Sequence, residues 1–382
     1  MHNLHSSSFY KAIDVLIIVY MRYKLLGRSG LRVSELCLGG MTFGEDWGSM
    51  LPGASKEEAR KIFDIFVSRG GNFIDTANIY QMGTSEKYIG ELISSEREKF
   101  VLATKYALTT NPDDPNASGN HRKNLVQSVN ASLKRLNTSY IDLLWVHVWD
   151  PLTPIEEVMR ALDDMVRSGK ILYIGISDAP AWVVSFANAI AEERDWTPFV
   201  AIQIMYNLIE RSAERDLLPM ARALDIGVTA WSPLAGGVLS GKYNIQKNAG
   251  EQKRFSANHP MSASFVNERN ISIAAEVQAI AEEANRTPSQ IALNWIRQRK
   301  NVHKDKEVII PIIGARTEAQ IDDNIGCLDF QLTQDQLKRL DDKSKIQLGF
   351  PHDFISESDS ANMTFLFGNT FSLIDNHRAG IL

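Results

Sequence analysis

The chain has 382 residues, of which 44% are hydrophobic and 23% charged, as is ordinary for a soluble globular protein. A formal net charge of −5 gives no reason to expect nucleic acid or an anionic membrane as a partner. The two cysteines, Cys37 and Cys327, lie far apart and outside any Cys-x-x-Cys motif, which argues against a disulfide framework and a zinc cluster and favours a cytoplasmic location.

The N-terminal stretch lacks the patterning of the rest of the chain. Its apolar run, residues 15–20, is too short to span a bilayer. We expect residues 1–22 to be a disordered extension, with a weak membrane anchor as the alternative. Regular patterning begins at Tyr23, and we expect residues 23–382 to form a single domain.

From Tyr23 the chain alternates between strands and helices. Residues 23–33 are typical of a hairpin with a glycine-bearing turn. Eight short apolar strands are expected at residues 36–39, 72–74, 101–104, 143–146, 171–176, 199–204, 228–231 and 308–313. Helices are expected at residues 56–67, 85–93, 122–136, 154–169, 182–193, 214–224, 265–283, 288–299, 317–325 and 334–343. The tail from Gln347 is aromatic and without helix or strand period. We expect it to fold over the mouth of the domain, with packing on the flank of the barrel as the alternative.

This order of elements indicates the fold class. Apolar strands that alternate with amphipathic helices form a parallel sheet covered on its faces. Eight such units, with polar residues at the strand ends, predict a (β/α)8 barrel whose site lies at the carboxyl ends of the strands. A doubly wound sheet is the weaker alternative, because no Gly-x-Gly-x-x-Gly motif follows the first strand.

Four chargeable residues follow consecutive expected strands. Asp75 ends one strand and Tyr80 comes shortly after it, while Lys105 and His147 end the next two. A lysine ammonium stabilises a phenolate and so lowers the pKa of a phenol, a carboxylate holds the lysine in place, and an imidazole can orient a carbonyl oxygen. Each residue alone could be a cap, a snorkelling strand end or a core histidine. Together they predict a general acid suited to carbonyl reduction.

Two further stretches suggest anion binding. Residues 236–242 nearly match a phosphate-binding loop, but Tyr243 replaces the hydroxyl residue that magnesium requires, so an NTPase is rejected. The loop could still offer backbone N–H groups to a pyrophosphate, or be a plain surface loop. Residues 314–317 place Arg316 and Thr317 at a helix N-terminus, which favours an anion site over a simple helix cap. No His-Glu-x-x-His or strand His-x-His motif occurs, so no metal is expected.

The sequence resembles the aldo-keto reductase superfamily, and most of all its aryl-alcohol-dehydrogenase-like branch, over residues 23–340. The resemblance is carried by residues 73–77 with Tyr80, 103–105, 142–147, 175–178, 231–234 and 314–316 with Gln320 and Asn324. It implies a (β/α)8 barrel that binds NADP(H) without a Rossmann domain.

The resemblance also implies roles for single residues. Tyr80 would be the proton donor, tuned by Lys105 and Asp75, and His147 would orient the substrate carbonyl. Tyr206 would stack on the nicotinamide, whereas from the residues alone it could either stack on a flat ring or simply pack in the core. The implied cofactor-binding residues are Gly40, Met41, Thr42, Asp75, Ser177, Asp178, Gln203, Tyr206, Trp231, Ser232, Leu234, Gly236, Leu239, Lys242, Arg254, Gly314, Arg316, Gln320 and Asn324.

Two positions depart from the family pattern. Asp178 stands where many members carry an asparagine that holds the carboxamide. Gly314 stands where many carry a phosphate-binding lysine, which leaves Arg316 as the main cation there.

Two classes of function remain open. One is a reductase that converts aldehydes and ketones, aromatic ones among them, to alcohols. The other is a regulatory subunit that binds NADPH, like the potassium-channel β-subunits, which keep the same four residues. The long tail and the lack of an inactivation-type N-terminal segment favour the enzyme. We expect a small carbonyl or alcohol substrate and neither nucleic acid nor membrane as a partner; the oligomeric state stays open.

Overall fold

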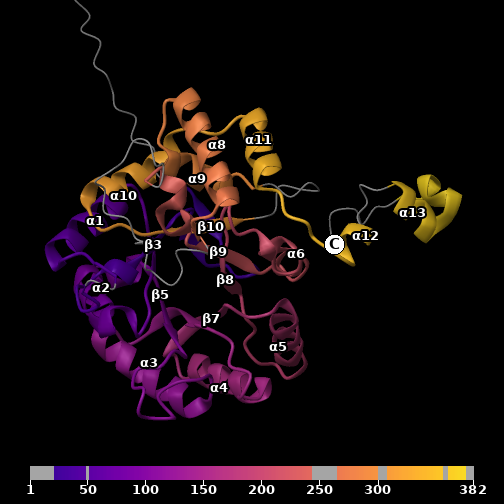
Figure 1. Cartoon of the computed structure of the whole chain (residues 1–382). Helices are drawn as coiled ribbons and strands as arrows, with labels where there is room; N and C mark the ends of the chain where they lie inside the picture. The colour runs from indigo at the N-terminus through magenta and orange to yellow at the C-terminus, as the bar shows by residue number, and fades with distance from the viewer. Residues whose placement is uncertain (1–20, 49–50, 243–264, 300–307, 356–359, 376–382) are drawn as a thin grey trace, which may run out of the picture.

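The computed structural model describes residues 21–48, 51–242, 265–299, 308–355 and 360–375. Eight parallel strands close into a barrel in the order β10-β3-β4-β5-β6-β7-β8-β9 (Figure 1). Their bounds are β3 Cys37–Gly39, β4 Phe73–Asp75, β5 Val101–Tyr106, β6 Ile141–Val146, β7 Ile171–Ser177, β8 Ala201–Met205, β9 Gly227–Trp231 and β10 Ile309–Ile313. The predicted (β/α)8 barrel is therefore confirmed.

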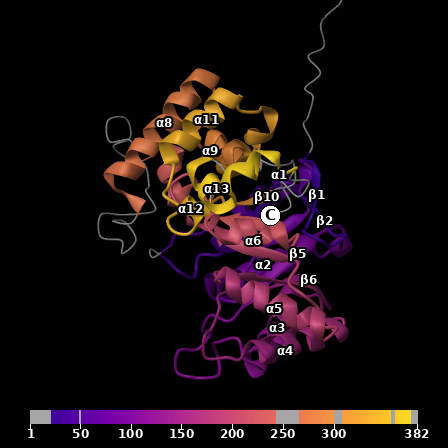
Figure 2. The same ribbon diagram turned by 90° about the vertical axis from the view of Figure 1, so that its right-hand side faces the viewer.

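Helices form a layer around the barrel, as the two perpendicular views show (Figures 1 and 2). They are α1 Lys56–Ser68, α2 Thr84–Ile93, α3 Arg122–Leu136, α4 Ile155–Arg167, α5 Ala181–Glu193, α6 Leu217–Ala223, α8 Glu268–Ala284, α9 Pro288–Arg297, α10 Glu318–Ile325 and α11 Gln334–Ser344. In α4 the buried residues Ile155, Val158, Met159 and Leu162 follow the spacing of one helical face, which packs on the sheet. No helix among the described residues is long and apolar enough to cross a membrane.

One expected helix is divided. The span 214–224 forms a short 3-10 turn, Ser212–Glu214, followed by α6. Pro219 has no N–H to donate to the carbonyl of Arg215, so a continuous α-helix through this span would lose a hydrogen bond.

The alternation of side chains along the strands determines which residues of the site point into the barrel. Ala103 of β5 and Trp145 of β6 face the barrel interior, whereas Leu102 faces the helices. Because side chains alternate along a strand, Lys105 and His147 continue the inward series at the carboxyl ends. The pattern that makes the strands apolar therefore also directs these two polar side chains inward.

The N-terminal hairpin closes the opposite end of the barrel. Its strands are β1 Tyr23–Leu25 and β2 Arg32–Ser34, and Leu26 and Val33 pack with the interior side chains. Gly27 adopts a φ of +54°, and a Cβ there would lie 2.4 Å from the carbonyl oxygen of Val200. Only glycine allows this turn to fit against the strand starts, and the carboxyl ends are left for the site.

The aromatic tail does not cover the mouth of the barrel, contrary to expectation. Its helices, α12 His352–Ile355 and α13 Ser360–Phe367, lead away from the barrel (Figure 1). Phe365 is 79% exposed, although its ring contacts Phe354 at 6.2 Å between centroids, and Phe367 stacks on Phe371. The described tail thus packs its rings on one another rather than on the barrel.

Candidate active site

A buried ion pair lies at the centre of the site. Lys105 Nζ donates to Asp75 Oδ2 and, at 2.8 Å, to the backbone oxygen of Thr76, and both charged side chains are buried. Gln203 Nε2 donates to the other carboxylate oxygen of Asp75 at 3.0 Å. Burial alone would lower the pKa of Lys105, but Asp75 and then Tyr80 outweigh it and raise that pKa. The lysine is therefore a fixed positive charge.

The half-buried phenol of Tyr80 lies against this charge. Lys105 Nζ is 4.8 Å from the centre of the Tyr80 ring. Tyr80 begins a 3-10 turn, Tyr80–Gly83, in which Gln81 and Met82 both have positive φ, so the chain turns sharply just behind the phenol. Burial raises the pKa of Tyr80, and the opposing effect of Lys105 is smaller. The expected lowering by lysine is present, but the net direction is upward because desolvation disfavours the phenolate. The phenol thus holds its proton at neutral pH.

The imidazole of His147 stands beside the phenol. The two ring centres are 5.8 Å apart and the ring planes are nearly perpendicular. Burial and the charge of Lys105 hold the pKa of His147 well below its usual value, so the ring is neutral at neutral pH. Among the described residues the buried Nδ1 has no hydrogen-bond partner. A neutral imidazole offers one N–H donor and one acceptor.

Trp47 is a site residue that sequence reasoning missed. Its ring meets the edge of Tyr80 at 6.2 Å between centroids, and its backbone N–H donates to Gln81 Oε1 at 2.9 Å. It lies in a loop after β3, where no periodicity indicates which way a side chain points.

The ends of β7, β8 and β9 are joined by hydrogen bonds. Ser177 is the buried last residue of β7. Asp178 follows with a φ of +44°; its N–H donates to the carbonyl of Gln203 at 3.3 Å, and Trp231 Nε1 donates to its Oδ1 at 3.0 Å. Gln203 also reaches Asp75, so this group is continuous with the ion pair.

Tyr206 does not lie at the carboxyl ends of the strands, which we call the strand-end face. The expectation that it stacks on the nicotinamide is therefore wrong. Its ring is fully buried and stacks on Trp295 at 5.4 Å between centroids, and its hydroxyl donates to Glu214 Oε1 at 2.6 Å. Gln203 points inward on β8, so alternation turns Tyr206 outward. The half-buried Trp231, inward on β9, lies at the carboxyl ends of the strands and offers an aromatic ring there.

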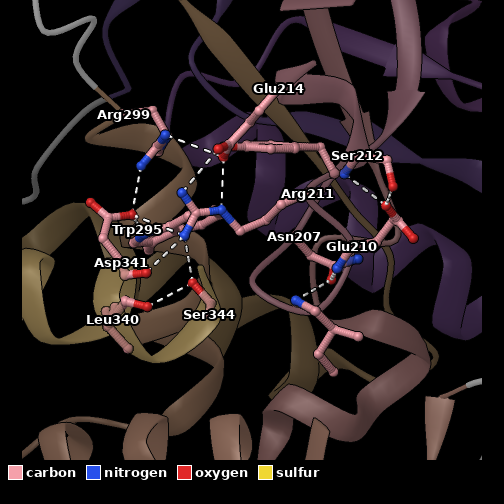
Figure 3. Close-up of polar contacts among 12 residues, drawn as sticks. Asn207, Glu210, Arg211, Ser212, Glu214, Trp295, Arg299, Leu340, Asp341 and Ser344 are labelled. Carbon is pink, nitrogen blue, oxygen red and sulfur yellow. Dashed lines mark hydrogen bonds and ion pairs between the residues drawn. The ribbon is translucent and has the colours of Figure 1, made fainter. Parts of the chain in front are cut away.

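Glu214, which accepts from the Tyr206 hydroxyl, belongs to a network of charged side chains. Figure 3 shows this network around Arg211, Glu214 and Arg299. Arg211 Nε donates to Glu214 at 2.8 Å, and Arg299 donates to Glu214 at 3.2 Å and to Asp341 at 2.7 Å. These contacts tie the loop after β8 to Arg299, which follows α9, and to α11. They support the wall of the barrel and lie outside the candidate site.

The loop after β9 is compact rather than a simple surface loop. Residues 235–240 form 3-10 turns, and Ser232, Gly236 and Gly237 all have positive φ. Gly236 N–H donates to Ser232 Oγ at 3.2 Å. Leu239 is buried, while Leu234 and Lys242 are half-buried. Arg254 lies outside the described residues.

The loops that follow β3 and β10, the first and last strands of the barrel, contact each other. Thr42 Oγ1 donates to the carbonyl of Ala315 at 2.6 Å, which brings the loop after β3 against the loop after β10. Within it Gly40 is buried against α2, where its carbonyl accepts from Ser85, and the carbonyl of Met41 accepts from Gln81.

Arg316 lies just before α10, and none of the described residues forms an ion pair with its guanidinium. Its N–H donates to Gln320 Oε1 at 2.9 Å, and Asn324 Nδ2 donates to the carbonyl of Gly314 at 3.3 Å. The side-chain amides of Gln320 and Asn324 therefore both form hydrogen bonds with the nearby backbone. The Arg316 side chain is half-buried. A Cβ at Gly314 would meet no atom within 4 Å, so this edge is open.

Comparison with known proteins agrees with this arrangement. A norsolorinic acid reductase, stcV, of Emericella nidulans is 38% identical over 86% of this chain and 83% of its own length. The putative aryl-alcohol dehydrogenase AAD14 of Saccharomyces cerevisiae is 36% identical over 88% of this chain and 90% of its own. The aldo-keto reductase ausK of Aspergillus calidoustus is 36% identical over 87% and 85%.

The family comparison covers the whole barrel. The model of the Aldo/keto reductase family matches residues 35–345, which run from the residues before β3 to the end of α11. Together with a closed barrel and a buried lysine–carboxylate pair beside a tyrosine and a histidine, this match shows that the chain is an oxidoreductase that belongs to the aldo/keto reductase family.

Proposed function

We propose that this protein reduces aldehydes and ketones to alcohols with NADPH, and that Tyr80 is the general acid. The observation that carries the proposal is the contact between the Tyr80 phenol and the buried Lys105–Asp75 pair. Relatives described as norsolorinic acid reductase and aryl-alcohol dehydrogenase support aromatic carbonyl compounds as the substrate class.

The donor set of the strand-end face fits a nicotinamide cofactor. Ser177, Asp178 and Gln203 present hydroxyl, carboxylate and amide groups for a carboxamide, and the Trp231 ring lies next to Asp178 for stacking. Further groups suit the pyrophosphate and the adenosine end: the turns after β9, Lys242 and Arg316. A bound NADPH would supply the hydride.

The protein's own groups handle the proton and the oxygen. A neutral His147 can donate its N–H to the carbonyl oxygen and hold it near Tyr80. Tyr80 then gives its proton to that oxygen as negative charge develops there. The phenolate left behind faces the ammonium of Lys105, which Asp75 keeps charged and in place. The raised pKa of Tyr80 favours the acid form that reduction requires.

Activity measurement tests the proposal directly. Purified protein is mixed with NADPH and a panel of aliphatic and aromatic aldehydes, and NADPH consumption is followed by absorbance. Tyr80→Phe removes only the phenol oxygen and should lower turnover by about two to four powers of ten while NADPH still binds. Tyr23→Phe is the control, because Tyr23 lies in the N-terminal hairpin, at the other end of the barrel, where its exposed hydroxyl donates to the carbonyl of Gly70.

The outcomes separate the two classes of function. A fall of less than about tenfold in Tyr80→Phe would show that another group supplies the proton. Tight NADPH binding with no turnover of any aldehyde would instead favour the regulatory subunit.

A further inference from the structure

We propose that the carboxylate of Asp178 discriminates between the redox states of the cofactor, binding the oxidised, positively charged nicotinamide more tightly than the reduced, neutral one. The inference rests on the proposed function, because it places a nicotinamide against the ends of β7 and β9. It assigns to Asp178 an electrostatic role that a neutral amide at this position could not fill.

The position of Asp178 is fixed by its backbone. Its N–H donates to the carbonyl of Gln203 at 3.3 Å, and its own carbonyl accepts from the N–H of Trp149 at 3.4 Å. Its φ of +44° lies in the left-handed region, which aspartate and asparagine tolerate better than most residues. The two hydrogen bonds fix the backbone of Asp178, so its side chain leaves the end of the strand in a defined direction.

The carboxylate is oriented but not neutralised. Trp231 Nε1 donates to Oδ1 at 3.0 Å, and a neutral indole brings no compensating charge. Among the described residues Oδ2 accepts no hydrogen bond, and Asp178 forms no ion pair within 4.0 Å. Trp231 also points inward at this face, so the hydrogen bond places the negative charge at the edge of the proposed stacking ring.

The charge acts on the catalytic groups. Burial by the surrounding barrel wall raises the pKa of Asp178, while Trp231 and Lys105 act to lower it. In turn the carboxylate contributes to the raised pKa of Tyr80. Asp178 as a whole residue is exposed, and hydration of its carboxylate favours the charged form on which the proposal rests. Its field therefore extends across the space between β7, β9 and Tyr80.

The field distinguishes the two forms of the cofactor. The nicotinamide ring is neutral when reduced and carries one positive charge when oxidised. A nearby carboxylate attracts the second form only. With a nicotinamide bound at this face, Asp178 would stabilise the positive charge that the ring gains when its hydride is transferred to the carbonyl carbon, while Tyr80 supplies the proton to the oxygen. The chain thus favours reduction once the substrate is bound, and it releases NADP+ less readily.

The test is Asp178→Asn, with the dissociation constants of NADP+ and NADPH measured by calorimetry at one pH and ionic strength. Asparagine keeps the left-handed backbone and can still accept from Trp231, so the variant removes the charge. It also adds an amide N–H donor, but a contact of that donor with the carboxamide is common to both redox forms and cancels in the ratio of the two constants. We expect the NADP+ constant to rise by about three- to tenfold relative to the NADPH constant, as suits one partly screened unit charge.

A matched control is available at the other end of the barrel. Asp225 precedes β9, is exposed and has a φ of +50°, so Asp225→Asn makes the same chemical change far from the site. That variant should leave the ratio of the two constants unchanged. Equal loss of both cofactors in Asp178→Asn, or no change in either, would overturn this inference alone. Failure of the wild-type protein to bind either nucleotide would overturn the proposed function and this inference with it.

Discussion

Replacement of Lys105 by methionine should have two separable effects, on stability and on catalysis. Methionine has a similar length but no charge. The Asp75 carboxylate then stays buried, and among the described residues Gln203 Nε2, at 3.0 Å, is its remaining side-chain donor. Removing one partner of a buried ion pair costs about 3–5 kcal/mol, because the other charge is left uncompensated. The free energy of unfolding in urea should fall by that amount.

A double variant separates the two effects. Lys105→Met together with Asp75→Asn removes both charges, and a buried pair replaced by neutral groups is often close to neutral in stability. Most of the lost stability should therefore return. Aldehyde reduction should stay at least about a hundredfold down in both variants, because the Tyr80 phenolate no longer faces an ammonium.

The assays are urea unfolding followed by circular dichroism and NADPH consumption with a good aldehyde. Lys338→Met is the control, since it breaks an exposed ion pair with Asp342 and should change neither quantity measurably. A fall of less than about 1 kcal/mol in the free energy of unfolding of Lys105→Met would contradict the reasoning, because an uncompensated buried carboxylate should cost more than that. A double variant as unstable as the single one would contradict it equally, because the unpaired carboxylate would not be the cause.

Three further predictions concern the cofactor and the pH dependence. Arg316→Ala should weaken NADPH by about ten- to hundredfold and leave NADH almost unchanged, because a charge-assisted contact to the 2′-phosphate is worth roughly 1.5–3 kcal/mol; equal loss in a fluorescence titration of both would move the contact to the shared pyrophosphate. Gly314→Lys should tighten NADPH without harming the fold, since a Cβ there meets no atom within 4 Å, and a lower unfolding midpoint would refute this. The pKa of His147 is depressed in the folded state, so its contribution to stability is complete above about pH 6.5 and is lost as the pH falls, by at most about 1.4 kcal/mol per pH unit. In His147→Gln the urea midpoint of unfolding should depend less on pH between about pH 5 and 7. An unchanged dependence of the midpoint on pH would assign the titration to another group.

Periodicity by itself determined the architecture and the direction of the central residues. Apolar strands separated by helical patterns predict the parallel barrel. Lys105 and His147 fall in the inward series of β5 and β6, so their convergence is readable from the sequence. The same alternation also indicates that Tyr206 faces outward on β8 and Trp231 inward on β9, which a resemblance carried over residue by residue does not reveal.

Only the tertiary structure decided the quantities that depend on contacts between distant segments. The upward direction of the Tyr80 pKa follows from desolvation by the assembled barrel, which no local pattern encodes. The contact of Trp47 with Tyr80 depends on where an irregular loop is placed. The aromatic tail has no period that matches a partner face, so its exposed arrangement could not be predicted. Short-range order along the chain therefore specifies strands and facing directions, whereas burial and charge at the site arise from packing between residues that lie far apart in sequence.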